Sequence, residues 1–243
     1  MMRVLVLRPQ VSAPATAARL AALGHVAVSV PLSAPVHDRE ATLAALAGRH
    51  SAITITSGEA ARVLQSLGDA LDPHLQTTVF AVGDATGRAA SRAGFRNVLA
   101  AARSDGDGLA ELIVDHRRQH GVPTDPLLYL AGFPRSSNFE DRLTAAGVAH
   151  VTVECYRMEP IRPADDALRP ALVDEPVDAV LLYSRESTRH FFELPLVAEH
   201  LERLERMRFL CISRNVAAVV PAALSKSVAV AATPDEAGLF DLL

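Results

Sequence analysis

Short apolar runs, many of them rich in β-branched residues, alternate with amphipathic stretches along the whole chain. Ten of these runs have the length of a buried strand rather than of a helix. The predicted strands are residues 3–8, 26–30, 52–56, 78–82, 97–101, 127–131, 149–155, 178–183, 208–212 and 227–231. Most stretches between them are rich in Ala, Leu and Arg, as in residues 13–23, 59–67 and 85–93, which favours helices. This alternation predicts an α/β fold built around parallel sheets.

The last five predicted strands follow the pattern of the first five. The matching pairs, at offsets that grow from 123 to 130, include Arg19 with Arg142, Gly24 with Gly147, Ser57 with Ser184, Glu59 with Glu186 and Asp105 with Asp235. We interpret the match as an internal repeat of a unit of about 120 residues. Chance similarity between Ala-rich helices is the alternative explanation.

Small polar residues and arginines follow six of the predicted strands, just ahead of a predicted helix. Where parallel strands end, the free N–H groups of helix N-termini bind anions, although Ser and Thr there also serve as plain helix caps. Equivalent loops in both halves favour an anion site in a cleft between two units. The candidate ligands are Arg8, Thr56, Ser57, Gly83, Thr86, Gly132, Arg135, Ser184, Arg185, Ser187, Ser213 and Asn215.

Charge and composition narrow the classes of partner. The 243 residues fit one or two domains, and 24 Lys and Arg against 28 Asp and Glu give a net charge of −4. Without a basic excess we expect no nucleic-acid partner and no membrane partner, so an anionic ligand must be held locally. Met1, Met2 and Arg3 lead straight into a strand rather than a signal sequence, which predicts a cytoplasmic protein.

Several common chemistries lack their motifs. The pair Gly83 and Gly87 lacks the third glycine of a dinucleotide fingerprint, and no phosphate-binding G-x-x-x-x-G-K-[S/T] motif occurs. His116 and His120 share a helix face, but no Glu beside His116 and no third ligand accompany them. Cys155 and Cys211 lie in apolar surroundings without metal-ligand spacing, so we expect reduced core thiols. No cofactor and no metal are predicted.

Several short segments together point to a known family. They are residues 4–9, 56–57, 81–86, 128–132 with Arg135, Tyr156, 183–187 and 232–236. In their order and spacing the chain resembles the uroporphyrinogen-III synthase family over essentially its full length. The resemblance implies two flavodoxin-like α/β domains that exchange their opening units, one made of residues 1–34 and 157–243 and the other of residues 38–153. Extended linkers at about 33–37 and 155–161 would join them, and prolines accompany both, Pro31 and Pro35 at the first and Pro160 and Pro163 at the second.

The sequence departs from the family pattern at two places. Glu59 stands where Asn is frequent, Glu186 mirrors it in the second half, and we expect such carboxylates to repel a polycarboxylate substrate. Residues 213–216 stand where a Gly and Thr pair is common, which removes hydroxyls and adds the cation of Arg214.

The resemblance implies an activity that needs no cofactor. Linear hydroxymethylbilane would close to uroporphyrinogen III with loss of water and inversion of the last pyrrole ring, because the electron-rich pyrroles expel the hydroxyl group themselves. Positioning would then be the main task of the protein. Tyr156, a phenol that stays protonated at neutral pH, is the candidate catalytic residue that assists departure of the hydroxyl. Its alternative role is packing in the linker.

Two other functions remain open at this point. One is a catalytically inactive two-lobed binding or regulatory protein, and the other is a glycosyltransferase-like protein, for which we find no acidic ribose-binding residues. For the enzyme we expect a monomer whose partner is a small linear tetrapyrrole.

Overall fold

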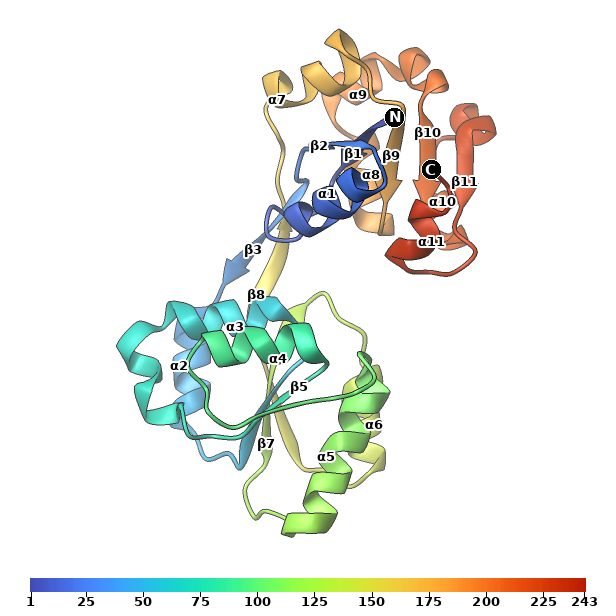
Figure 1. Cartoon of the computed structure of the whole chain (residues 1–243). Coiled ribbons are helices and arrows are strands. Elements are labelled where there is room, and N and C mark those ends of the chain that lie inside the picture. Colours follow the sequence, from blue (N-terminus) through green and yellow to red (C-terminus); the bar gives the residue numbers. More distant parts are fainter. The chain divides into compact units, whose positions relative to one another are not determined.

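The computed structural model describes residues 1–243, and the chain divides into two compact units. The first unit combines Met1–Ala34 with Glu159–Leu243, and the second is Pro35–Met158 (Figure 1). The unit boundaries fall within two strands, β3 (Ser33–His37) and β8 (His150–Pro160).

The first unit is built around a five-stranded sheet in the order β11-β10-β9-β1-β2, in which every recorded pair of strands is parallel. Successive residues of a strand point to opposite faces, so Leu5 lies in one apolar core and Val4 and Val6 in another. Because helices cover both faces of the sheet, residues 4–6 are all apolar. The strands are β1 (Arg3–Val6), β2 (Val26–Ser29), β9 (Ala179–Leu182), β10 (Arg208–Cys211) and β11 (Val228–Val230). The helices are α1 (Ala13–Ala22), α7 (Asp165–Arg169), α8 (Arg185–Phe192), α9 (Pro195–Glu199), α10 (Arg214–Ala217) and α11 (Glu236–Phe240).

The second unit contains a six-stranded mixed sheet in the order β3-β8-β7-β4-β5-β6. Its other strands are β4 (Ala52–Ile55), β5 (Val79–Ala81), β6 (Val98–Ala100) and β7 (Leu127–Phe133). Leu64 of α3 and Ala90 of α4 pack on one face, whereas Ile113 of α5 and Leu143 of α6 pack on the other (Figure 1). The helices are α2 (Arg39–Ala47), α3 (Gly58–Ser66), α4 (Asp84–Arg92), α5 (Gly106–His120) and α6 (Asn138–Ala145).

The predicted α/β class is confirmed, and each of the ten predicted strands is present with ends shifted by a few residues. The structure adds β3 and extends β8 to Pro160, so the stretches expected to be linkers are neighbouring strands of one sheet. The segment Ser33–His37 lacks an alternating apolar pattern and contains Pro35, which an edge strand tolerates because one side of its backbone is unpaired.

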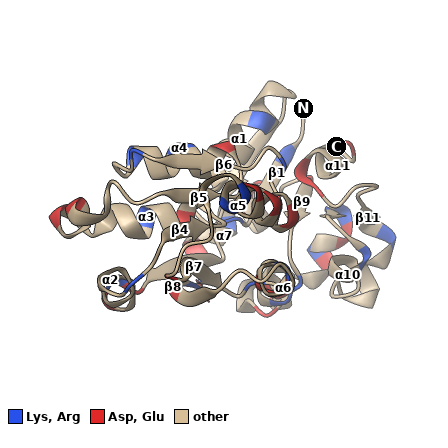
Figure 2. Cartoon of the chain, turned by 90° about the horizontal axis from the view of Figure 1, so that it is seen from below, with Lys and Arg blue, Asp and Glu red and all other residues tan.

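The two sheets have the same strand order when β7 and β8 take the places that β1 and β2 have in the first sheet. The internal repeat itself stays a prediction. Lys and Arg are interspersed with Asp and Glu along the ribbon (Figure 2), in agreement with the small net charge of −4. No helix has the length and apolar character required to cross a membrane.

Candidate functional site

Tyr156 and Ser57 meet at the carboxyl edge of the second sheet. Ser57 is the N-cap of α3, and its Oγ accepts a hydrogen bond from the Ala60 N–H at 3.2 Å. Tyr156, on β8, donates its phenolic hydrogen to the same oxygen at 3.0 Å. Burial raises the pKa of Tyr156 above its usual value of 10, so the phenol is protonated at neutral pH.

Gly132 makes room for the ring of Tyr156. A Cβ atom at this position would lie 2.3 Å from the Tyr156 Cζ atom and 2.4 Å from its Oη atom, far closer than non-bonded atoms approach. The pairing of β7 with β8 shifts register between Ala131 and Gly132, which brings Gly132 opposite Tyr156. The predicted ligand Gly132 therefore contacts the tyrosine and positions its ring.

Thr56 pairs with a second tyrosine. Its Oγ1 atom lies 2.9 Å from the Oη atom of Tyr129, a buried residue of β7. Tyr129 also packs edge-on against Phe139, with ring centroids 5.0 Å apart, and burial raises its pKa. The neighbouring hydroxyls of Thr56 and Ser57 thus each hold a tyrosine from an adjacent part of the sheet.

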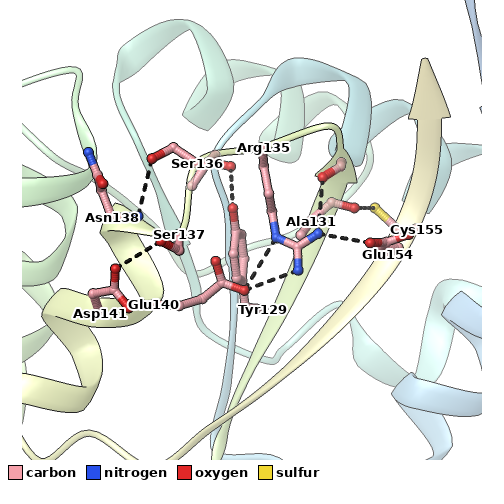
Figure 3. A network of polar contacts seen from close by, with 12 residues as sticks. Tyr129, Ala131, Arg135, Ser136, Ser137, Asn138, Glu140, Asp141, Glu154 and Cys155 are labelled. Carbon is pink, nitrogen blue, oxygen red and sulfur yellow. Dashed lines mark hydrogen bonds and ion pairs between the residues drawn. The ribbon is translucent and has the colours of Figure 1, made fainter.

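Arg135 is held between two carboxylates (Figure 3). Its guanidinium lies 3.1 Å from Glu140 on α6 and 3.1 Å from Glu154 on β8, and it donates to the Gly132 carbonyl at 3.4 Å. The residue predicted as a substrate ligand therefore ties the end of β7 to its two neighbouring elements, and its charge is already compensated within the protein.

Gly83 and Thr86, both predicted as substrate ligands, are buried in the structure. A Cβ atom at Gly83 would lie 2.5 Å from the Ser104 Oγ atom, so this glycine allows close packing of the neighbouring loop. Thr86 lies inside α4 and is buried. The assignment of Thr86 as a substrate ligand stays a prediction.

The carboxylate of Glu59 has partners within the protein. Its carboxylate is buried and pairs with His37 at 2.6 Å and with Arg62 at 2.7 Å. Burial alone would raise the pKa of Glu59, but the hydrogen bonds from Arg62 and His37 outweigh it and lower the pKa. Its mirror residue Glu186 pairs with Arg189 at the surface. The guanidinium of Arg62 compensates the charge of Glu59 within the protein, and the repulsion of a polycarboxylate stays a prediction.

In the first unit, four side chains converge on Glu236. Its Oε1 atom accepts from Arg8 at 2.8 Å, Thr16 at 2.6 Å and Tyr183 at 2.7 Å, and its Oε2 atom pairs with Arg19. The guanidinium of Arg8 also lies over the Tyr183 ring, 4.6 Å from its centroid. The predicted ligand Arg8 is therefore fixed at the end of β1 by a carboxylate of the segment 232–236, to which the sequence analysis assigned no role in the site.

The serines of the first unit are helix caps. Ser184 Oγ accepts from the Ser187 N–H at 3.1 Å and lies 2.8 Å from the Ser187 Oγ, and Ser213 Oγ accepts from the Val216 N–H at 3.4 Å. Arg185 and Asn215 are exposed in the first turns of α8 and α10. The N–H groups of Ser57 and Ser184 donate no backbone hydrogen bond. At these positions the side chain caps the helix and the main-chain donor is free.

The cysteines and one pair of histidines are the remaining reactive residues that the sequence analysis considered. Cys155 and Cys211 are free and buried, as expected, and burial raises the pKa of the Cys155 thiol to about 12 and that of Cys211 to about 11. The rings of His116 and His120 stack on each other with centroids 4.2 Å apart. No group of three or more His, Cys, Asp or Glu residues could hold a metal ion.

Two α/β units with polar residues at the carboxyl edges of their strands place the chain in the class of two-unit α/β proteins. The sequence model of uroporphyrinogen-III synthase HemD matches residues 14–241. The chain therefore belongs to the uroporphyrinogen-III synthase family, and the resemblance seen in the sequence is confirmed. This family consists of lyases of porphyrin and haem biosynthesis, and cyclisation of a linear tetrapyrrole is the activity of the chain.

Solved structures show a similar fold. Uroporphyrinogen-III synthetase from Helicobacter pylori is 13% identical, with a TM-score of 0.61 over 100% of this chain and 98% of that one. A mutant uroporphyrinogen III synthase from the extremely thermophilic bacterium Thermus thermophilus is 21% identical, with a TM-score of 0.50 over 90% of this chain and 88% of that one. No curated protein matches the sequence.

Proposed function

We propose that the chain closes hydroxymethylbilane to uroporphyrinogen III at the carboxyl edges of its sheets, with Tyr156 assisting the loss of the hydroxyl group. The observation that supports this assignment most directly is the fixed phenol of Tyr156, which Ser57 and Gly132 hold at such an edge. The protein acts as a cytoplasmic monomer without a nucleic-acid partner.

Backbone N–H groups bind the substrate carboxylates. The arginines at the strand ends are already paired, Arg135 with Glu140 and Glu154, and Arg8 with Glu236. The free N–H groups at the starts of α3 and α8 therefore supply the anion contacts, since helix N-termini carry a partial positive charge. Such donors hold carboxylates without ordering a long side chain.

The chemistry is loss of hydroxide from the hydroxymethyl carbon on the first pyrrole, followed by attack of the substituted carbon of the last pyrrole on that carbon. The pyrroles stabilise the resulting cation themselves, so the protein has to assist ionisation and hold the chain in the geometry that forms the spiro intermediate. Because Tyr156 is protonated at neutral pH, its phenol is a suitable donor to the departing hydroxyl.

The test is formation of the type III isomer from hydroxymethylbilane. We expect Tyr156→Phe to lower kcat by about 10- to 1,000-fold with an unchanged melting temperature, the range of a positioned acid. Tyr129→Phe is the matched control, because it removes one phenolic oxygen from the neighbouring strand, and we expect its kcat to stay within a few-fold of wild type. A folded wild-type protein that forms no type III product would instead be an inactive homologue, and a fully active Tyr156→Phe variant would remove the acid role.

A further inference from the structure

We propose that Ser57 donates the hydrogen bond to the departing hydroxyl group and that Tyr156 acts through Ser57 rather than on the substrate directly. The inference rests on the proposed function, and it changes which side chain touches the reacting atoms.

Within the protein, the Ser57 hydroxyl accepts two hydrogen bonds and donates none. A serine hydroxyl has two acceptor lone pairs and one proton. The phenol of Tyr156 and the N–H of Ala60 occupy both lone pairs, at 3.0 and 3.2 Å. The Ser57 proton has no acceptor within the protein, and the residue is half-buried rather than enclosed. The open position beside this hydroxyl therefore suits an acceptor oxygen on a ligand.

The phenol of Tyr156, by contrast, already donates its proton to a partner within the protein. Its proton points at the Ser57 oxygen, and its ring packs against the backbone of Gly132. To reach the substrate directly, the phenol would have to break the bond to Ser57 and leave this packed position. Hydrogen bonds in a chain polarise one another, so a phenol behind Ser57 makes the serine hydroxyl a stronger donor.

The corresponding serine of the first unit lacks this arrangement. Ser184 is also the N-cap of a helix that follows a central strand, but its Oγ pairs with the Ser187 hydroxyl, and the neighbouring Tyr183 donates to Glu236 instead. A capping serine therefore does not need a hydrogen bond from a tyrosine, so the pairing of Tyr156 with Ser57 has another role. It places the proton transfer in the second unit.

The step balances in protons and electrons. The carbon–oxygen bond of the hydroxymethyl group breaks, and its electron pair stays on oxygen. That oxygen takes the Ser57 hydroxyl proton, the Ser57 oxygen takes the phenolic proton of Tyr156, and water leaves. The pyrrole cation then releases its N–H proton, which returns to the tyrosinate, so the substrate loses one water and both side chains are restored.

A double-mutant cycle on the full-length protein tests the relay, with kcat for the type III isomer as the readout. We expect Ser57→Ala and Tyr156→Phe each to lower kcat by about 10- to 1,000-fold. If the two residues act in series, kcat of the double variant should lie within about 3-fold of kcat of the less active single variant. Ser57→Thr keeps the hydroxyl and the cap, so it should recover most of the rate lost in Ser57→Ala.

Loss of a helix cap is controlled separately. Asp105 caps α5 by accepting from the Gly108 N–H at 2.7 Å, and Asp105→Ala should lower the melting temperature as Ser57→Ala does while leaving kcat near wild type. Fold losses that multiply in the double variant, or a fully active Ser57→Ala protein, would overturn the relay while the cyclase activity stands. A wild-type protein that makes no type III product would overturn the proposed function and the relay together.

Discussion

Replacing Gly132 with alanine should displace Tyr156 without removing any atom of it. The new Cβ atom would lie 2.3 Å from the Tyr156 Cζ atom, and carbon atoms in contact are about 3.5 to 4.0 Å apart, so the ring has to move by about 1.2 Å or more. The phenol then loses its hydrogen bond to Ser57, which already measures 3.0 Å.

A misplacement of about 1 Å at a reacting centre can cost roughly 100-fold in rate, so we expect Gly132→Ala to lower kcat by about that factor. Overpacking should lower the free energy of unfolding by about 1 to 3 kcal/mol. The assay combines type III product formation with urea unfolding, and the tyrosine absorbance or a crystal structure reports the position of the ring.

Gly58→Ala is the matched control for a methyl group added at the same edge. Its Cβ atom would lie 4.0 Å from the Ala89 Cβ atom, an ordinary contact, so we expect wild-type kcat and unchanged or slightly raised stability. A Gly132→Ala protein with wild-type kcat would refute the argument that this glycine positions Tyr156.

The remaining predictions concern the backbone donor, the buried carboxylate, the first unit and cofactors. Ser57→Pro should weaken substrate binding more than Ser57→Ala does, because proline removes the N–H group, and equal KM values in two folded variants would assign binding to the hydroxyl. The lowered pKa of Glu59 means that its pairing with Arg62 and His37 stabilises the fold above the usual pKa of 4.5 and stops doing so as the pH falls through the lower folded value. Urea unfolding of Glu59→Gln at a series of pH values should show its stability deficit shrinking in acid, and a deficit independent of pH would contradict this. Glu236→Gln should lower the free energy of unfolding by about 1 to 3 kcal/mol, since it weakens four contacts, and wild-type stability would show that they contribute little. Activity should survive a metal chelator, because the pyrroles supply the driving force for ionisation, whereas a loss that one metal ion restores would refute this.

Sequence alone determined the features that depend on neighbours within a few residues. The apolar run at residues 4–6 predicts a strand because both faces of the first sheet are buried, and the structure confirms it. Ser57, Ser184 and Ser213 follow the local rule for helix caps, and each caps the helix that follows it. The order of the short family segments was also enough to indicate the family.

Strand pairing decided which of these residues meet. Gly132 and Tyr156 are 24 positions apart, and they lie together only because β7 pairs with β8 in a register that shifts after Ala131. The segment Ser33–His37 has no strand pattern of its own, and it forms an edge strand because β8 offers it a free edge.

Charge compensation also depended on the tertiary structure. The sequence shows Glu59 next to a binding loop but not the imidazole of His37, which comes from β3, and it shows Arg8 as a free cation although Glu236 lies 228 residues away. Local sequence restricts the backbone through propensity and periodicity, which act over one or two turns. Whether a charged side chain faces a ligand or an internal partner depends on contacts between distant segments, and those are fixed only when the sheets assemble and their faces are buried.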